Sequence, residues 1–286
     1  CMSMRSRSLP LASSALLLLL PATRAFMAAP AAPLSSSGAA KAQTCTTPWK
    51  MAVEGDIRVF LVRHGAVDLT TPEHFYPKGS FYGGDDVPLS ALGEREAKAA
   101  GEMLKDEGID LVFSSPLRRA VYGAKQVASH HGSMEPILDD RFREIERGRW
   151  LGLTKEMVDE KYPGDLAKFA ADPTWKEHGG ETYTELFERV LDGFDHVLKV
   201  AREKKASRVA LVSHMWVTKS IVTNSMGLKP TQQDEWAKVD IPTASISVMD
   251  FPREGGREGV VVSAGVKPPL TEEEAKEAMA GNKWGG

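Results

Sequence analysis

Two histidines follow short apolar runs in this chain, and their positions suggest chemistry. Arg63 and His64 end the run Ile57–Val62, and His214 ends a second run that begins at Arg208. Short apolar runs of this kind are typical of buried strands, and in open α/β sheets the reactive groups lie just beyond the carboxyl ends of the strands. The pattern therefore predicts that the two histidines share one site.

Arginines near these histidines in the predicted fold indicate an anionic ligand. Arg118 and Arg119 are expected in the first turn of a helix, where free backbone N–H groups also favour an anion. Arginine binds phosphate oxygens in pairs and keeps its charge, and a neutral imidazole nitrogen in line with phosphorus can act as a nucleophile. With Arg63, these residues predict a site for a phosphate dianion that still needs a proton donor for the leaving oxygen.

The elements that must position these residues alternate between strand and helix. The alternation predicts the α/β class, as a three-layer αβα sandwich with a mostly parallel central sheet. Besides the two runs above, the expected strands cover 110–113, 245–251 and 260–262, the last two as a hairpin. The expected helices run from Ser90 to about Glu107, from Ser115 to about His131, from Thr154 to Lys161, near Leu166 to Ala170, from Thr182 to about Lys204, and from His214 to Gly227.

Composition limits the classes of function. Charged residues make up 26% of the 286 residues and the net charge is -3, which argues against a nucleic-acid protein with a broad basic face. The only cysteines, Cys1 and Cys45, precede the expected folded domain, so neither a disulfide framework nor a cysteine-built metal site is expected. Residues 66–88 form a long loop directly after His64, and we interpret it as a wall on the substrate side.

The first fifty residues are predicted to be a targeting presequence. Arg5 and Arg7 precede an apolar run from Leu9 to Leu20, which is typical of a signal peptide and shorter than the ~20 residues of a membrane span. The following stretch is rich in Ala, Pro and Ser and holds no acidic residue before Glu54, as in a transit peptide. We expect a domain over 51–266 and a polar tail over 267–286.

Six segments, in order, resemble the histidine phosphatase superfamily, the phosphoglycerate mutase-like group. Leu61–Gly65 resembles its L-V-R-H-G signature, and Asp86–Gly93 its D-x-P-L-S-x-x-G element. The other matches are Ser114–Ala120 to S-S-x-L-x-R-A, Phe142–Glu144 with Gly148–Gly152 to L-R-E…G-x-W-E-G, Gly179–Thr182 to G-G-E-S, and Val212–His214 to the second histidine motif.

The resemblance implies a role for each matched residue. His64 would be the nucleophile and become phosphorylated, and Glu144 would act as general acid and then general base. Arg63, Arg119 and His214 would bind the phosphoryl oxygens and stabilise their charge in the transition state. No cofactor and no metal are expected, because the arginines supply the positive charge.

Several assignments have close competitors in the sequence. Arg118 neighbours the matched arginine and is expected to face solvent, and Glu146 is the acid most easily confused with Glu144. Leu151 stands where the family element usually has glutamate, and Met215 where a small residue is common. His74, His178 and His196 are expected on the surface.

The implied activity is metal-independent hydrolysis of a phosphate monoester on a small metabolite. The short stretch from Trp150 to Gly179 favours a phosphatase, since mutases of this family resemble one another in carrying a longer segment there. The segment Tyr82–Leu89 is similar to α-ribazole phosphatase-like members. A mutase-type phosphoryl transfer and an inactive phosphate-binding scaffold remain the alternatives, and the oligomeric state is open.

Location follows from the presequence. A signal peptide joined through Ala25–Phe26 to a transit-like segment resembles the two-part plastid presequences of algae with complex plastids. The alternative is an ordinary secretory signal followed by a linker. We expect no nucleic-acid partner and no stable membrane anchor.

Overall fold

A computed structural model of the chain describes Trp49 and residues 56–270. The chain divides into two units, Cys1–Cys45 and Thr46–Gly286, and the first lies wholly outside the described residues. The predicted targeting segments therefore lie outside the described residues as well, apart from Trp49. This residue is buried and packs edge-on against Phe60, with 6.3 Å between the ring centroids.

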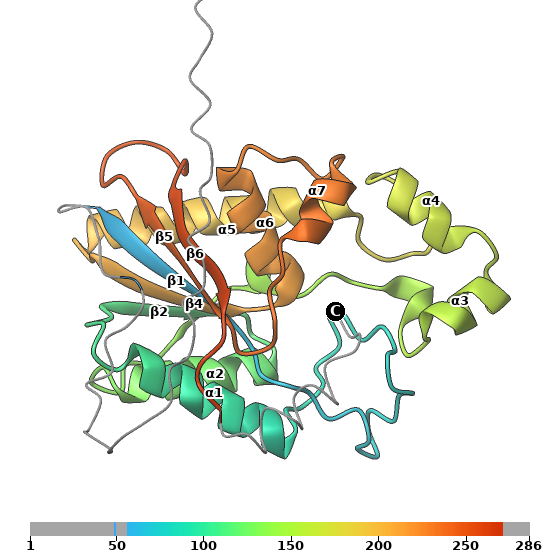
Figure 1. The fold of residues 1–286 in the computed structure, drawn as a ribbon, viewed down its shortest axis with the longest axis horizontal. Helices are drawn as coiled ribbons and strands as arrows, with labels where there is room; N and C mark the ends of the chain where they lie inside the picture. Colours follow the sequence, from blue (N-terminus) through green and yellow to red (C-terminus); the bar gives the residue numbers. More distant parts are fainter. Residues whose placement is uncertain (1–48, 50–55, 271–286) are drawn as a thin grey trace, which may run out of the picture. The chain divides into compact units, whose positions relative to one another are not determined.

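The sheet of the second unit has six strands in the order β3-β2-β4-β1-β5-β6 (Figure 1). Strands β3, β2, β4 and β1 run parallel, and the hairpin of β5 and β6 adds an antiparallel edge beside β1. The predicted α/β class with a mostly parallel central sheet is confirmed. The strands are β1 (Ile57–Arg63), β2 (Leu111–Ser114), β3 (Ile137–Leu138), β4 (Arg208–Ser213), β5 (Ile246–Phe251) and β6 (Val260–Val266).

Helices cover both faces of this sheet, which gives the three layers (Figure 1). Helices α1 (Ala91–Leu104) and α2 (Arg118–Ser129) pack on one face, and α5 (Tyr183–Glu203) and α6 (Met215–Ser225) pack on the other. Shorter helices follow the connections: α3 (Lys155–Lys161), α4 (Asp165–Ala171), α7 (Gln233–Lys238) and the 3₁₀ turns Asp140–Phe142 and Gly148–Trp150. No helix in the described part of the chain has the length and apolar character needed to span a bilayer.

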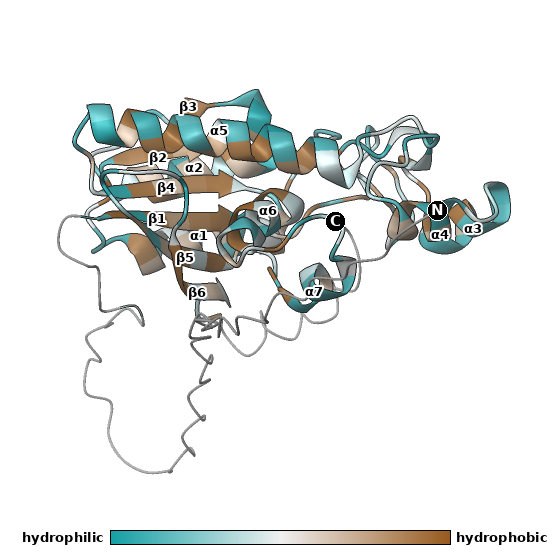
Figure 2. Cartoon of the chain, turned by 90° about the horizontal axis from the view of Figure 1, so that it is seen from above, coloured by the Kyte–Doolittle hydropathy of each residue, from teal (hydrophilic) through white to brown (hydrophobic). Residues whose placement is uncertain are grey.

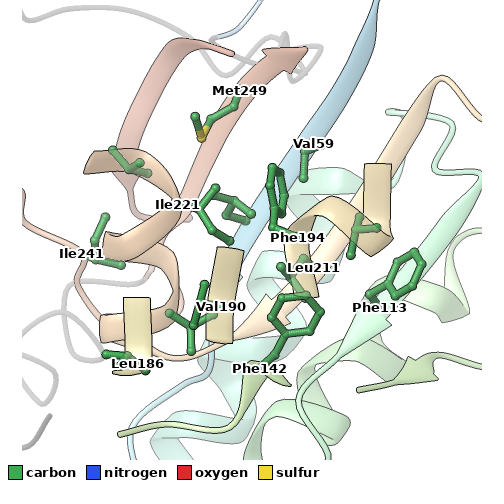
Figure 3. Close-up of a cluster of buried hydrophobic side chains, with 14 of the residues drawn as sticks. Val59, Phe113, Phe142, Leu186, Val190, Phe194, Leu211, Ile221, Ile241 and Met249 are labelled. Atoms are coloured by element: carbon green, nitrogen blue, oxygen red, sulfur yellow. The ribbon is translucent and has the colours of Figure 1, made fainter. Parts of the chain in front are cut away.

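Strand β1 lies in the centre of the sheet and is buried along its whole length. Its alternate residues face opposite layers, so Val59 packs with Phe194 of α5 while Phe60 packs toward α1 and α2. Figure 3 shows the first of these two cores, and Figure 2 shows apolar strands beneath the striped helix α5. Thr182 begins α5 with a capping box, in which Thr182 and Glu185 each accept a hydrogen bond from the other's backbone N–H.

Several predicted boundaries are wrong, for local reasons. Helix α2 begins at Arg118 and not at Ser115, because the backbone N–H of Ser115 still donates to Val212 and extends the sheet. Helix α1 ends at Leu104, before the predicted Glu107. Strand β6 is longer than predicted, and α7 was not predicted.

Candidate active site

The two predicted histidines lie side by side at the carboxyl ends of neighbouring strands. Strands β1 and β4 pair in parallel with Arg63 opposite Ser213, so both end at the same level. The backbone N–H of His64 continues this ladder and donates to the carbonyl of Ser213 at 3.0 Å. The rings of His64 and His214 meet edge to face with 5.1 Å between centroids. The two histidines therefore lie together in one place, as expected from the sequence.

The ring of His64 is oriented by a backbone carbonyl. Its Nδ1 lies 2.7 Å from the carbonyl oxygen of Gly65, which can only accept, so Nδ1 carries the proton and Nε2 keeps its lone pair. The side chain is 2% exposed. Burial holds the pKa of His64 well below 6.5, and the charges of Arg119 and Arg63 lower it further. A neutral imidazole with a free Nε2 is the form that can attack phosphorus.

Two buried arginines stand beside the histidines with their charges uncompensated. Arg63 donates from Nη1 to the carbonyl of Ile241 at 2.7 Å, and Arg119 donates to the carbonyls of Gly83 and Asp85. Neither forms an ion pair with a carboxylate in the described part of the chain. The Nε atoms of both are buried without a hydrogen-bond partner. Carbonyls fix these guanidinium groups and leave their charge for an anion.

His214 is held by a serine. Its Nε2 lies 2.8 Å from the hydroxyl of Ser115, at the end of β2, while its buried Nδ1 has no partner in the described residues. Burial keeps the pKa of His214 well below 6.5, with further lowering by Arg119 and His64. The unpartnered atoms of His214, Arg63 and Arg119 are the groups that three phosphoryl oxygens would satisfy.

Glu144 is the buried carboxylate of this site. It is 2% exposed; its Oε1 accepts from the N–H of Ile145, and its Oε2 accepts from the N–H of Trp216 at 3.3 Å. Burial lowers the pKa of Arg119, and the nearby Tyr82 and Glu144 oppose that shift, so Glu144 lies within electrostatic reach of Arg119. The competing Glu146 is exposed. The geometry distinguishes the two acids in favour of Glu144.

A pair of glycines brings the His64 loop against helix α1. A Cβ on Gly65 would lie 2.2 Å from the carbonyl oxygen of Gly93, and a Cβ on Gly93 would lie 1.9 Å from the carbonyl oxygen of Ala66. Buried Glu96, on the same helix, accepts from the N–H of Ala66 at 2.8 Å. The first turns of α1 therefore set the position of the chain that follows His64.

The structure brings all five sequence-predicted site residues together and leaves Arg118 outside, exposed and paired with Asp86. Three further polar side chains in this region were not predicted as site residues: Ser115, Arg147 and Lys219. Ser115 was predicted as the start of a helix, and Arg147 belongs to a charged run that resembles a solvated surface. Among residues 49 and 56–270, no three His, Cys, Asp or Glu side chains are grouped so as to hold a metal ion.

Two histidines predicted on the surface are buried instead. His178 is 1% exposed because its ring packs against both Trp150 and Trp175, at centroid distances of 4.5 and 5.5 Å. His74 is covered as well, with Nε2 3.6 Å from Asp85. His196 is exposed on α5, as predicted.

Comparison with known proteins identifies the family. The family model of the histidine phosphatase superfamily (branch 1) matches residues 59–263. Phosphoserine phosphatase 1 of Hydrogenobacter thermophilus is 33% identical over 159 residues, which cover 55% of this chain and 71% of that protein. Glucosyl-3-phosphoglycerate phosphatase of Mycobacterium tuberculosis is 36% identical over 133 residues, 46% of this chain and 56% of its own length.

Solved structures agree with this result. The native mycobacterial glucosyl-3-phosphoglycerate phosphatase superposes with a TM-score of 0.61 at 25% identity, over 74% of this chain and 99% of that one. The α-ribazole phosphatase of Shigella flexneri also gives a TM-score of 0.61, over 76% of this chain and all of that one. At 19% identity, that second likeness concerns the fold alone.

Proposed function

Because the chain belongs to the histidine phosphatase superfamily, we propose that it is a phosphomonoesterase that hydrolyses a small phosphorylated metabolite through a phosphohistidine on His64. One observation carries this proposal. A neutral, carbonyl-oriented His64 lies among two buried arginines, Arg63 and Arg119, that have no carboxylate partner in the described residues. A phosphate dianion supplies the two negative charges that such a site lacks.

In the first step, His64 Nε2 attacks phosphorus and the bond from phosphorus to the ester oxygen breaks. Arg63, Arg119 and His214 hold the three non-bridging oxygens, where charge accumulates. Glu144 gives its proton to the leaving oxygen, which departs as an alcohol. The products are the free alcohol, a phosphohistidine and an ionised Glu144.

In the second step, water replaces the alcohol. Glu144 removes a proton from the water as its oxygen attacks phosphorus, and the bond from phosphorus to Nε2 breaks. Inorganic phosphate leaves, and His64 and Glu144 return to their starting forms. These two steps require no metal, because the arginines and His214 stabilise the charge on the phosphoryl oxygens.

Two considerations favour a phosphatase over a mutase. Relatives with matched sequence are named as phosphatases of phosphoserine and of glucosyl-3-phosphoglycerate, both phosphate esters of small molecules. The connection between Trp150 and Gly179 holds only α3 and α4, of seven residues each. A long covering segment that would keep water from a phosphohistidine has no counterpart within this connection.

The test is hydrolysis of an aryl phosphate by the purified protein in the presence of a chelator. We expect metal-independent turnover that His64→Ala abolishes, and a base-stable, acid-labile phosphate on the parent protein after rapid quenching. Turnover that persists in His64→Ala would refute the nucleophile. A phosphohistidine that transfers only to a second alcohol would favour the mutase, and phosphate binding without any phosphohistidine would favour the scaffold.

We also propose delivery to a complex plastid through residues 1–50, with the secretory pathway as the alternative. The support is the order of segments, an apolar run and then an acid-free stretch. A fluorescent protein fused to residues 1–50 is expected in the plastid of an alga with complex plastids. Its release into the medium would support the secretory alternative.

A further inference from the structure

Two buried cations lie beside the site and have no part in the two steps above. Arg147 is 3% exposed and Lys219 is 7% exposed. Both contact the ring of Trp216, with the guanidinium carbon 5.9 Å and the ammonium nitrogen 5.2 Å from its centroid. Neither forms an ion pair with a carboxylate within 56–270. We call Arg147 and Lys219 the cation pair.

The cation pair lies on the side of the site where the leaving group must be. Trp216, whose ring contacts both cations, donates its backbone N–H to Glu144. Burial lowers the pKa of Lys219, with opposing effects from Asp240 and Glu144 and a further lowering by Arg63. Since a general acid must touch the leaving oxygen, the groups next to Glu144 face the body of the substrate.

Unsatisfied polar atoms in this cluster indicate a missing ligand. Arg147 Nε and Trp216 Nε1 are both buried without a hydrogen-bond partner. The guanidinium of Arg147 otherwise hydrogen-bonds to the side chain of the buried Tyr183 and contacts the ring of Phe81, at 5.0 Å. Burying a cation away from water is costly unless an anion or hydrogen bonds compensate it. An anionic group bound by Arg147 and Lys219 would supply both the negative charge and the hydrogen-bond acceptors.

The balance of buried charge selects the kind of anion. Arg63 and Arg119 match the two charges of the transferred phosphate. On the other side the cation pair carries two positive charges, and the protonated Glu144 that donates to the leaving oxygen balances neither of them. Asp240, the other acid near Lys219, is exposed to solvent. A carboxylate of the substrate supplies negative charge at this place, and its two oxygens fit the planar fork of an arginine.

We propose that Arg147 and Lys219, together with Trp216, form a subsite for a carboxylate of the substrate. The substrate class is then phosphate monoesters of small hydroxy acids or hydroxy amino acids. This inference rests on the proposed phosphatase function and adds the identity of the leaving group. The cation pair binds the carboxylate, and it takes no part in breaking the phosphate ester.

The experiment compares two pairs of esters that differ in the carboxylate. O-phosphoserine is compared with phosphoethanolamine, and 3-phosphoglycerate with glycerol 3-phosphate. In each pair we expect kcat/KM to favour the carboxylate ester by about 10-fold or more, the range of a hydrogen-bonded charge. Equal values within both pairs would overturn the inference, while absence of turnover for every ester would instead count against the proposed function.

Substitutions assign the preference to residues. Arg147→Gln and Lys219→Gln are each expected to lower kcat/KM for the carboxylate esters about 10-fold or more and to leave kcat/KM for the esters without a carboxylate within about threefold. Arg147→Lys keeps the charge and should retain part of the preference. Lys199→Gln removes a cation from the exposed face of α5 and should change neither value. A preference that survives both Gln variants would overturn the assignment.

A binding measurement separates the two proposals. On a His64→Ala background the esters are not turned over, and calorimetry reports their affinity directly. O-phosphoserine is expected to bind about 10-fold more tightly than phosphoethanolamine, and added Arg147→Gln should equalise them. This result stands whether or not the parent hydrolyses esters. Equal affinities before the second substitution would refute the subsite, and thermal unfolding of each variant shows that it is folded.

Discussion

At the scale of single residues, the site depends on which atom of each side chain has been left without a partner. His64 has its Nδ1 on a carbonyl and its Nε2 free, while His214 has its Nε2 on Ser115 and its Nδ1 free. The two imidazoles therefore have opposite orientations. In the proposed reaction, His64 presents a lone pair to phosphorus, and His214 presents an N–H to a phosphoryl oxygen when Ser115 Oγ donates to Nε2.

Ser115→Ala tests this orientation. The substitution removes the hydroxyl 2.8 Å from His214 Nε2, so the ring loses the contact that fixes its tautomer. We expect kcat to fall about 10-fold with a smaller change in KM, because the lost interaction acts mainly on the transition state. Steady-state hydrolysis measures both. Ser129→Ala removes an exposed hydroxyl from α2 and should be silent; an unchanged kcat in Ser115→Ala would contradict the assigned role.

Acid is expected to destabilise the fold through the two histidines. Burial holds the pKa of both histidines well below 6.5. Below about pH 6.5 the unfolded chain therefore binds protons at these histidines that the folded chain does not bind. This contribution to stability is complete above pH 6.5 and is lost as the pH falls toward the folded-state values. Each histidine contributes up to about 1.4 kcal/mol per pH unit in that window.

Urea unfolding at pH 7.5, 6.5 and 5.5 measures this dependence. The double variant His64→Gln/His214→Gln should show a shallower loss of unfolding free energy on acidification than the parent. His196→Gln, which removes an exposed histidine, should follow the parent. Equal slopes for the parent and the double variant would show that these histidines do not couple folding to pH.

At the scale of elements, the contact between Gly93 and the His64 loop links helix α1 to the proposed nucleophile. In Gly93→Ala the new methyl group would meet the carbonyl of Ala66, which is backbone and cannot turn aside. The loop after His64 must move, and a displacement of this kind costs up to about 100-fold in rate. We expect kcat/KM to fall at least about 10-fold even though alanine favours a helix.

Gly123→Ala is the matched control for this substitution. It places the same methyl group in α2, where the nearest atom is a methyl of Val212 at 3.2 Å, and that side chain can shift slightly. Activity within about twofold of the parent is expected, because nothing at the site moves. Both activities come from the same assay. If Gly93→Ala were as active as Gly123→Ala, the glycine contact would have no role in positioning.

Elements that carry their own signal were predictable from the sequence. The apolar run of β1, the capping box at Thr182 and the order of the family motifs all lie within short stretches. The burial of Arg147 could not be predicted in this way, because it depends on Trp216 and Phe81, which come from distant segments. His178 has the same explanation, since one of the two rings that cover it is 28 positions away at Trp150.

Misassigned boundaries have a second cause, competition between elements. Ser115 has the side chain of a helix cap, but its N–H is used by the sheet, so the helix starts later. Helix α7 has only six residues and no apolar repeat long enough to detect. In both cases the deciding interaction belongs to a neighbour that the local pattern does not contain.

At the scale of the whole molecule, the end of β1 opposite to the site carries a buried ion pair. Arg58 donates from Nε and Nη2 to the two oxygens of Asp250 on β5, each at 2.8 Å, and from Nη1 to the carbonyl of Trp49. Asp250→Asn leaves the buried guanidinium unpaired. We expect the free energy of unfolding to fall by about 3–5 kcal/mol and kcat of the folded protein to stay unchanged.

Asp195→Asn provides the comparison for that prediction. Asp195 pairs with Arg257 across an exposed surface, and such pairs contribute about 1 kcal/mol or less. Chemical denaturation of both variants gives the free energies of unfolding, and an assay in the absence of denaturant gives kcat. Equal losses of unfolding free energy in the two variants would show that the buried ion pair contributes no more to stability than the exposed one.

The central place of β1 also governs the timing of folding during synthesis. Arg58 and its partner Asp250 are 192 positions apart in the chain, and both neighbours of β1 in the sheet come from beyond residue 207. At about 5–20 residues per second, a ribosome makes β1 roughly 10–40 seconds before β5 exists. Arg63 and His64 therefore emerge early. The carbonyl of Ile241, which accepts a hydrogen bond from Arg63 Nη1, is made only near the end of translation. A chain that ends before Ile241 has His64, the proposed nucleophile, but lacks this contact, so we expect it to be inactive.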